Sequence, residues 1–238
     1  EMFPFSSKML ITNIFNQVNN NIFSLVLGKL YTKVEVGTYT QANKWNTMGY
    51  TTINGMITSV AQPVFASISE DKGYQLKALR KMLRFTAFVS FPAMFGLSLT
   101  APELITLAIT DKWLPSALFM QILCIGGAFL PLSNLFSQLL LSRGHSSTYM
   151  WCTIALSVLQ LATAYIAYPY GIQTMLLAFI TINTGWIVVW LHFVHREIRL
   201  TFFSFLKLSS IALTSFSTLT GGFSLLLIAF FNLFAATD

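Results

Sequence analysis

Carboxamide and hydroxyl side chains form one stripe along the first long apolar segment of the chain, residues 8–30. Their spacing of three and four residues places them on a single face of a helix with 3.6 residues per turn. A carboxamide that faces hydrocarbon without a hydrogen-bond partner costs roughly 4–8 kcal/mol, so this face must meet other helices or a water-filled cavity. The stripe consists of Asn13, Asn16, Gln17, Asn20 and Ser24.

A second stripe of similar chemistry follows in residues 45–68. It consists of Thr47, Tyr50, Thr51, Asn54, Thr58 and Gln62. Two consecutive helices with long polar faces are best explained by a shared polar interface that lines a transport cavity. The alternative is helix–helix hydrogen bonding without a cavity, which is worth on the order of 1 kcal/mol per bond in a membrane.

The composition is that of an integral membrane protein, because 55% of the residues are hydrophobic and only 9% are charged. Soluble domains carry about 25% charged residues. The sequence predicts an all-α, polytopic transmembrane bundle that occupies residues 1–238 and has about seven spanning helices, each near the ~20 residues that a bilayer requires. The expected spans are residues 8–30, 45–68, 85–100, 116–141, 148–168, 172–192 and 208–234, and the first two are the least apolar.

The basic residues sort to opposite sides of these spans. Ten of the 14 lysines and arginines fall on one side, and the other side holds only Lys29, Lys33, Lys44 and Lys112. The positive-inside rule places the ten in the cytoplasm, together with the amino end of the chain. The net charge of +6 therefore reflects membrane topology, and no nucleic-acid partner is expected.

Two cytoplasmic connections are predicted to lie at the membrane surface. In residues 72–84, Lys77, Arg80, Lys81 and Arg84 share one helical face and leucines share another. This pattern is typical of a short basic amphipathic helix on a leaflet of anionic lipids. Such a helix would serve as an anchor and topology signal, or alternatively would recruit an anionic lipid-linked substrate. Residues 196–207 form a second interfacial connection of the same kind.

The sequence contains no catalytic constellation, so an enzyme is not expected. His192 and His195 lie three residues apart near the end of one span, which favours an interfacial pair over a metal site, and no metal or cofactor is expected. Cys124 and Cys152 lie in apolar stretches and are expected to be packing residues. All eight acidic residues fall at termini, connections or segment ends, so no carboxylate relay is expected within this stretch.

An ordered set of short motifs extends over nearly the whole chain. They are NNIFSLVLGK at 20–29, VGTY at 36–39, PVFASIS at 63–69, APELI at 101–105, DKW at 111–113 and LLSRG at 140–144. In this order they resemble the carboxy-terminal half of polysaccharide flippases of the O-antigen or capsule type. These flippases belong to the multidrug/oligosaccharidyl-lipid/polysaccharide exporter superfamily.

The resemblance implies one half of a two-bundle transporter in the bacterial inner membrane. It implies that the chain flips an isoprenoid diphosphate-linked oligosaccharide from the inner to the outer leaflet by alternating access, for the biosynthesis of surface polysaccharide such as lipopolysaccharide or exopolysaccharide. The two polar stripes would then line the sugar path, and Lys8 and Lys29 would be candidate contacts for the diphosphate. The expected partner is an amino-terminal bundle of the same protein that is missing from this sequence, and a last helix is expected to be missing too.

Two other functions fit the same composition. One is a drug/cation antiporter of the same superfamily, which a mid-membrane acid would favour. The other is a non-transporting seven-helix membrane scaffold, in which the stripe asparagines should tolerate replacement by leucine. A seven-helix receptor would place the amino end outside the cell, which the distribution of basic residues opposes.

Overall fold

The computed structural model describes residues 2–68 and 71–198, apart from the side chains of residues 2–9, 11, 18–20, 22 and 23. Over this part of the chain the protein is all-helical, as the composition predicts. The α-helices are α1 (Met2–Leu30), α2 (Lys33–Ser67), α3 (Lys72–Leu99), α4 (Ala101–Ala108), α5 (Ser116–Gly127), α6 (Leu130–Ser142), α7 (Ser146–Ala167) and α8 (Ile172–Ile198). Two short 3₁₀ helices, η1 (Asp111–Trp113) and η2 (Tyr168–Tyr170), lie in connections.

Four helical segments in the described ranges are long and apolar enough to cross a membrane. They are Lys72–Leu99, Ser116–Ser142, Ser146–Tyr170 and Ile172–Ile198, which match the third to sixth expected spans. Helices α1 and α2 have 29 and 35 residues, so their length suffices, but the polar stripes lower their hydropathy. The seventh expected span, residues 208–234, lies outside the described residues.

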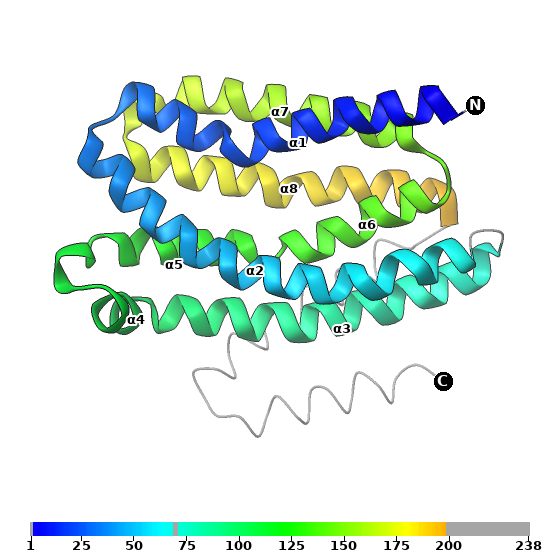
Figure 1. Cartoon of the computed structure of the whole chain (residues 1–238), viewed down its shortest axis with the longest axis horizontal. Helices are drawn as coiled ribbons and strands as arrows, with labels where there is room; N and C mark the ends of the chain where they lie inside the picture. Colours follow the sequence, from blue (N-terminus) through cyan, green and yellow to red (C-terminus); the bar gives the residue numbers. More distant parts are fainter. Residues whose placement is uncertain (1, 69–70, 199–238) are drawn as a thin grey trace.

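The long helices run roughly parallel or antiparallel and form one bundle (Figure 1). Helices α1 and α7 lie side by side at one edge, and α3 lies at the opposite edge. Helix α2 crosses the bundle and packs against α3, α5 and α6, while α8 packs against α5, α6 and α7. Large apolar side chains fill the interior between these helices, among them the fully buried Phe65, Phe91 and Phe136.

Helix α2 begins at a capping box. Thr32 precedes the helix and its side chain accepts a hydrogen bond from the backbone N–H of Glu35, while the Glu35 carboxylate accepts one from the backbone N–H of Thr32. This reciprocal pair satisfies two of the donors that every helix start leaves without an intrahelical partner. The cap places the start of α2 at Lys33, well before the expected start at residue 45.

The basic stretch at residues 72–84 is continuous with the helix that follows it, and does not form a separate helix. Asp71 caps a single helix that continues from Lys72 to Leu99, so the basic stretch is the first part of a membrane helix. Leu79 and Leu83, on its apolar face, are buried in the protein core with 0% and 2% exposure. The apolar face therefore packs on protein, and only the basic face remains available to anionic lipids.

Pro131 marks a real break in the fourth expected span. Helix α5 ends at Gly127 and α6 begins at Leu130, with Pro131 in the first turn, where its missing N–H removes no helical hydrogen bond. The buried Ser90 hydroxyl of α3 donates a 2.8 Å hydrogen bond to the carbonyl oxygen of Ala128 within the break. The Ser90 side chain thus supplies the hydrogen bond that a backbone N–H would have given this carbonyl oxygen in a continuous helix.

The connection between α7 and α8 is a tight turn. Tyr168–Tyr170 forms a 3₁₀ turn, and Gly171 follows it with φ of +91°, a left-handed backbone conformation that glycine adopts at little steric cost. This turn brings η2 close to the connection between α1 and α2, where the Tyr31 hydroxyl donates a hydrogen bond to the carbonyl oxygen of Tyr168.

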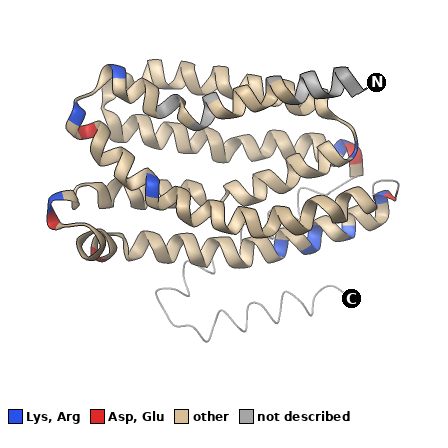
Figure 2. Ribbon diagram, viewed as in Figure 1, with Lys and Arg blue, Asp and Glu red and all other residues tan. Residues whose placement is uncertain are grey.

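Charged residues gather mainly at the two ends of the bundle (Figure 2). One end holds the α1–α2 connection and η1, and the other holds the start of α3, the α6–α7 connection and the end of α8. We call these the η1 end and the α3-start end. Of the second predicted interfacial connection, residues 196–207, the structure describes only 196–198, which are the last residues of α8.

Candidate functional site

The polar stripe of α1 is divided between packing and exposure. Asn16 is half-buried, and its carboxamide donates a 3.1 Å hydrogen bond to the hydroxyl of Tyr149 in α7. Asn13 and Gln17 are exposed, and Ser24 is half-buried. The side chains of Asn20 and Lys8 lie outside the described part of the chain. Asn16 therefore contributes to helix packing, while Asn13 and Gln17 remain available to a ligand or to another part of the protein.

The stripe of α2 is divided in the same way. The Asn134 carboxamide of α6 donates hydrogen bonds to Asn54 Oδ1 at 2.8 Å and to Thr58 Oγ1 at 3.0 Å. The Thr51 hydroxyl donates to the carbonyl oxygen of Thr47 in its own helix. Thr47 and Tyr50 are half-buried, and Gln62 is exposed. Asn54 and Thr58 thus form the helix–helix bonds of the alternative interpretation.

Among the described residues, the two stripes do not form the predicted direct interface. Helix α1 packs along α7, whereas α2 packs against α3, α5 and α6. The two helices meet near their connection and diverge from there (Figure 1). The physical reason is that each stripe is hydrogen-bonded to a different neighbouring helix. The α1 stripe contacts Tyr149 of α7, and the α2 stripe contacts Asn134 of α6. That both stripes line one cavity stays a prediction.

Lys44 is a candidate site residue, although it precedes the expected second span, which begins at residue 45. It lies eleven residues after Lys33, the first residue of α2, and therefore about 16 Å along the helix axis at 1.5 Å per residue. It is exposed, and its helical position coincides with those of Thr51 and Gln62. No acidic side chain in the described part of the chain lies within ion-pair distance of it.

Lys29 has a simpler local explanation. It is exposed in the last turn of α1, where a cation interacts favourably with the negative end of the helix dipole. Lys29 and Lys44 therefore differ in position, since Lys29 lies at a helix end and Lys44 within a long helix. A contact between Lys29 and a diphosphate stays a prediction.

A polar network joins four elements at the α3-start end. Gln75 of α3 is fully buried, and its Nε2 donates to the carbonyl oxygen of Phe65 in α2 at 3.2 Å. Its Oε1 accepts a 2.7 Å hydrogen bond from Arg143, which follows α6. Glu197 of α8 then pairs with Arg143 at 3.4 Å and with His145 at 3.2 Å. This network ties the α3-start end together, so any opening at this end would have to break or move it.

The partner residues were harder to find than the stripes themselves. Asn134 and Tyr149 lie in apolar segments, and periodicity alone does not reveal which stripe an isolated polar residue meets. Lys44 could have been placed from sequence, because the pattern Thr32-x-x-Glu35 is a capping-box signal for a helix start at residue 33. A helix drawn from that start includes Lys44 in the polar face.

Comparison with known proteins gives partial-length matches. Residues 1–118 match a family described as "Polysaccharide biosynthesis protein". The chain is 27% identical over 152 residues to the teichuronic acid biosynthesis protein TuaB of Bacillus subtilis (strain 168), covering 63% of this chain and 32% of that protein. It is 27% identical over 139 residues to the lipopolysaccharide biosynthesis protein WzxC of Escherichia coli (strain K12), covering 58% of this chain and 28% of that protein.

A third relative gives a match of similar size. The chain is 27% identical over 139 residues to an uncharacterized membrane protein in the cps region of Klebsiella pneumoniae, which covers 58% of this chain and 29% of that protein. The chain thus covers less than a third of the length of each of these relatives. No solved structure matches the chain significantly.

Proposed function

We propose that this chain, whose residues 1–118 match a family described as "Polysaccharide biosynthesis protein", is part of a flippase for a lipid-linked oligosaccharide. The substrate is an isoprenoid diphosphate that carries a sugar chain, and the flippase moves it from the inner to the outer leaflet by alternating access. Two of the relatives are named for the biosynthesis of teichuronic acid and of lipopolysaccharide. These names support a surface glycan as the cargo.

The exposed polar face of α2 carries this proposal. Lys44 and Gln62 are exposed on one side of a helix whose other side packs against α3, α5 and α6. A charged side chain at the hydrocarbon level of a membrane is costly and is found facing a bundle interior or a water-filled cavity. The exposed face of α2 therefore faces water or another part of the protein.

The chemistry of this face suits a glycosylated diphosphate. Gln62 offers a carboxamide and Thr47 a half-buried hydroxyl, which can donate to and accept from sugar hydroxyls without requiring a net charge on the ligand. The Thr51 hydroxyl donates within its own helix and can still accept from a sugar hydroxyl. Lys44 supplies a positive charge that a diphosphate would neutralise. Asn13 and Gln17 of α1, which are also exposed, would add carboxamides to the same path.

The other half of the path has to come from outside this chain. The exposed faces of α1 and α2 fit a second bundle of the same protein, in the way that two repeats of a transporter enclose a site between them. We place the assembly in the bacterial inner membrane with the α3-start end in the cytoplasm, because the basic residues concentrate at that end. The chain transports and does not catalyse a covalent step.

The two other functions receive less support. The acidic residues in the described part of the chain, such as Glu35, Asp71 and Glu197, lie at helix starts, helix ends or connections, which does not favour the carboxylate relay of a cation antiporter. A non-transporting scaffold would not need an exposed lysine on the polar face of a membrane helix.

The proposal is tested by surface polysaccharide export in cells that lack the chromosomal gene and express the intact protein. We expect Lys44→Gln to reduce export at least tenfold at an unchanged protein level, and Lys44→Arg to retain most of it. Lys33→Gln is the matched control, because Lys33 is also exposed but lies at the first position of α2. Normal export with Lys44→Gln, or normal export in the deletion strain, would contradict the proposal.

A further inference from the structure

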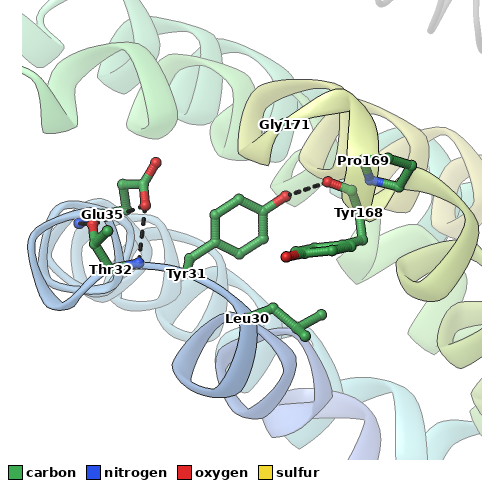
Figure 3. A pocket seen from close by; sticks show the side chains of 7 residues that line it. All are labelled: Leu30, Tyr31, Thr32, Glu35, Tyr168, Pro169 and Gly171. Carbon is green, nitrogen blue, oxygen red and sulfur yellow. Dashed lines mark hydrogen bonds between the residues drawn. The ribbon is translucent and has the colours of Figure 1, made fainter.

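A pocket of about 420 Å³ opens at the η1 end of the bundle (Figure 3). One wall comes from the α1–α2 connection and the start of α2, and the other comes from η2 and the residue after it. The lining residues are Leu30, Tyr31, Thr32 and Glu35 on the first wall and Tyr168, Pro169 and Gly171 on the second. We call this hollow the η1-end pocket.

Two aromatic rings form its apolar surface. The rings of Tyr31 and Tyr168 lie 5.6 Å apart between centroids and are tilted by 78°, so the edge of one ring meets the face of the other. Tyr168 is 43% exposed, which leaves much of its surface open to a ligand. The face of an aromatic ring is electron-rich and attracts the weakly positive C–H groups of an apolar molecular face. A pyranose ring presents such C–H faces.

Polar groups lie at the first wall of the same pocket. The Glu35 carboxylate accepts hydrogen bonds from the backbone N–H of Thr32 at 3.0 Å and from its hydroxyl at 2.8 Å, both through Oε2. Within the described part of the chain, Oε1 accepts no hydrogen bond. A carboxylate oxygen in this position can accept a hydrogen bond from a ligand hydroxyl, and charge-assisted bonds of this kind are roughly twice as strong as neutral ones.

Tyr31 holds the two walls together. Its hydroxyl donates a 3.0 Å hydrogen bond to the carbonyl oxygen of Tyr168. Burial and, to a lesser extent, the negative charge of Glu35 raise the pKa of Tyr31 above its ordinary value of 10.0. The hydroxyl therefore keeps its proton at physiological pH, and the walls stay joined through a backbone group that side-chain substitutions at position 168 leave in place.

The charge of the pocket selects among ligands. Its seven lining residues include one acid, Glu35, and no base. A phosphate or a uronate carboxylate would meet a like charge and find no cation in the lining. A neutral ligand with hydroxyl groups and C–H faces meets both an acceptor and an aromatic surface.

From this combination we infer that the η1-end pocket is a binding site for a neutral sugar residue. The inference rests on the proposed function for its physiological ligand, which would be a neutral sugar of the cargo glycan as it reaches the outer face. The pocket lies at the bundle end that is poor in basic residues, which is the outer end under the positive-inside rule. It is separate from the exposed face of α2, where Lys44 is suited to the diphosphate.

The test is saturation-transfer NMR on the intact protein in lipid nanodiscs. The probes are the methyl glycosides of glucose, galactose and N-acetylglucosamine, with methyl glucuronide as the acidic comparison. We expect transfer from the protein to the C–H protons of at least one neutral glycoside and much weaker transfer to the glucuronide. Loss of ring stacking in Tyr168→Ala should weaken binding about fivefold, and Tyr168→Phe should bind nearly as the parent does.

Glu35→Gln provides a second variant that should fold. Glutamine at this position still completes a capping box with Thr32, so the start of α2 is kept while the negative charge is removed. We expect it to weaken binding of the neutral glycoside several-fold and to narrow the difference from the glucuronide. The inference is overturned if no neutral glycoside binds, or if Tyr168→Ala and Glu35→Gln both bind as the parent does.

Failure of this site and failure of the proposed function give different results. Binding of a free glycoside in nanodiscs requires no transport, and the export assay with Lys44 variants requires no binding in the η1-end pocket. Loss of binding in Tyr168→Ala together with normal export would show a sugar site that export does not need. Absence of binding together with a strong effect of Lys44→Gln would reject the sugar site alone.

Discussion

The carboxamide of Asn134 donates a 2.8 Å hydrogen bond to Oδ1 of Asn54, which joins α6 to α2 within the bundle. A second bond from the same group reaches Thr58 Oγ1, one turn further along α2, at 3.0 Å. Interhelical hydrogen bonds in membrane proteins contribute about 0.6 kcal/mol on average. Because Asn134 makes two such bonds, its contribution to the free energy of unfolding should be measurable.

We therefore expect Asn134→Leu to lower the free energy of unfolding by about 1–2 kcal/mol, because the substitution removes both bonds and leaves Asn54 Oδ1 without this donor. Thermal unfolding of the detergent-solubilised protein measures the change as a fall in Tm of a few degrees. Asn13→Leu is the matched control, since Asn13 is exposed and should leave Tm unchanged. Equal Tm values for Asn134→Leu and the parent protein would show that these bonds do not stabilise the bundle.

Gln75 should be sensitive to an apolar replacement of similar size. Gln75→Leu would remove an acceptor from Arg143 and a donor from the carbonyl of Phe65, and an unsatisfied buried polar group costs about 1–3 kcal/mol. We expect a clear loss of Tm and of folded yield. Gln173→Leu, at an exposed position of α8, should have little effect on either. A stable Gln75→Leu protein would mean that water replaces both partners.

Glycine at position 127 leaves space for the side-chain ends of Asn46 in α2 and Met94 in α3. A methyl group there would collide with the carboxamide oxygen of Asn46 and would lie 2.7 Å from the terminal methyl of Met94. We expect Gly127→Ala to destabilise the bundle by about 1–3 kcal/mol, the usual range for overpacking. Gly185→Ala in α8 is the control, because a methyl group at position 185 meets nothing within 4 Å. Similar Tm values for the two variants would contradict this packing.

Single cysteines can test the orientation. We expect Lys112→Cys, at the η1 end, to react with a membrane-impermeant maleimide in intact cells, because the positive-inside rule places that end outside. Lys77→Cys, in the basic stretch of α3, should react only after the cells are permeabilised. The native Cys124 and Cys152 are buried, so background labelling should be low. The reverse labelling pattern would invert the proposed topology.

Much of the fold follows from local sequence signals, since hydropathy and periodicity locate α3 and the helices from α5 to α8. Proline and glycine also coincide with helix boundaries, since Pro131 lies in the first turn of α6 and the Tyr168–Tyr170 turn with Gly171 precedes α8. These features depend on residues close together in the chain. The partners of the polar stripes lie far away in the sequence. A stripe indicates that a helix face needs hydrogen-bonding groups, but it does not indicate which residues supply them.

For residues 72–84, the sequence likewise does not show what the apolar face of the helix packs against. The alternation of leucines and basic residues is identical whether Leu79 rests on lipid or on protein. Only the tertiary arrangement decides, and it buries Leu79 and Leu83 completely or almost completely. The position of Lys44 is different in kind, because the local capping box of Thr32 and Glu35 starts α2 at Lys33 and so includes Lys44 in the helix.

The hydrogen bond from Ser90 to Ala128 bears on ion leakage. A helix break at membrane depth exposes carbonyl groups that would otherwise recruit water, and a chain of such waters would let protons pass. Here the buried Ser90 hydroxyl of α3 donates a hydrogen bond to the Ala128 carbonyl oxygen instead, so the break between α5 and α6 needs no water molecule at this carbonyl. The wall of the bundle can thus bend between α5 and α6 without admitting water that could carry protons across the membrane.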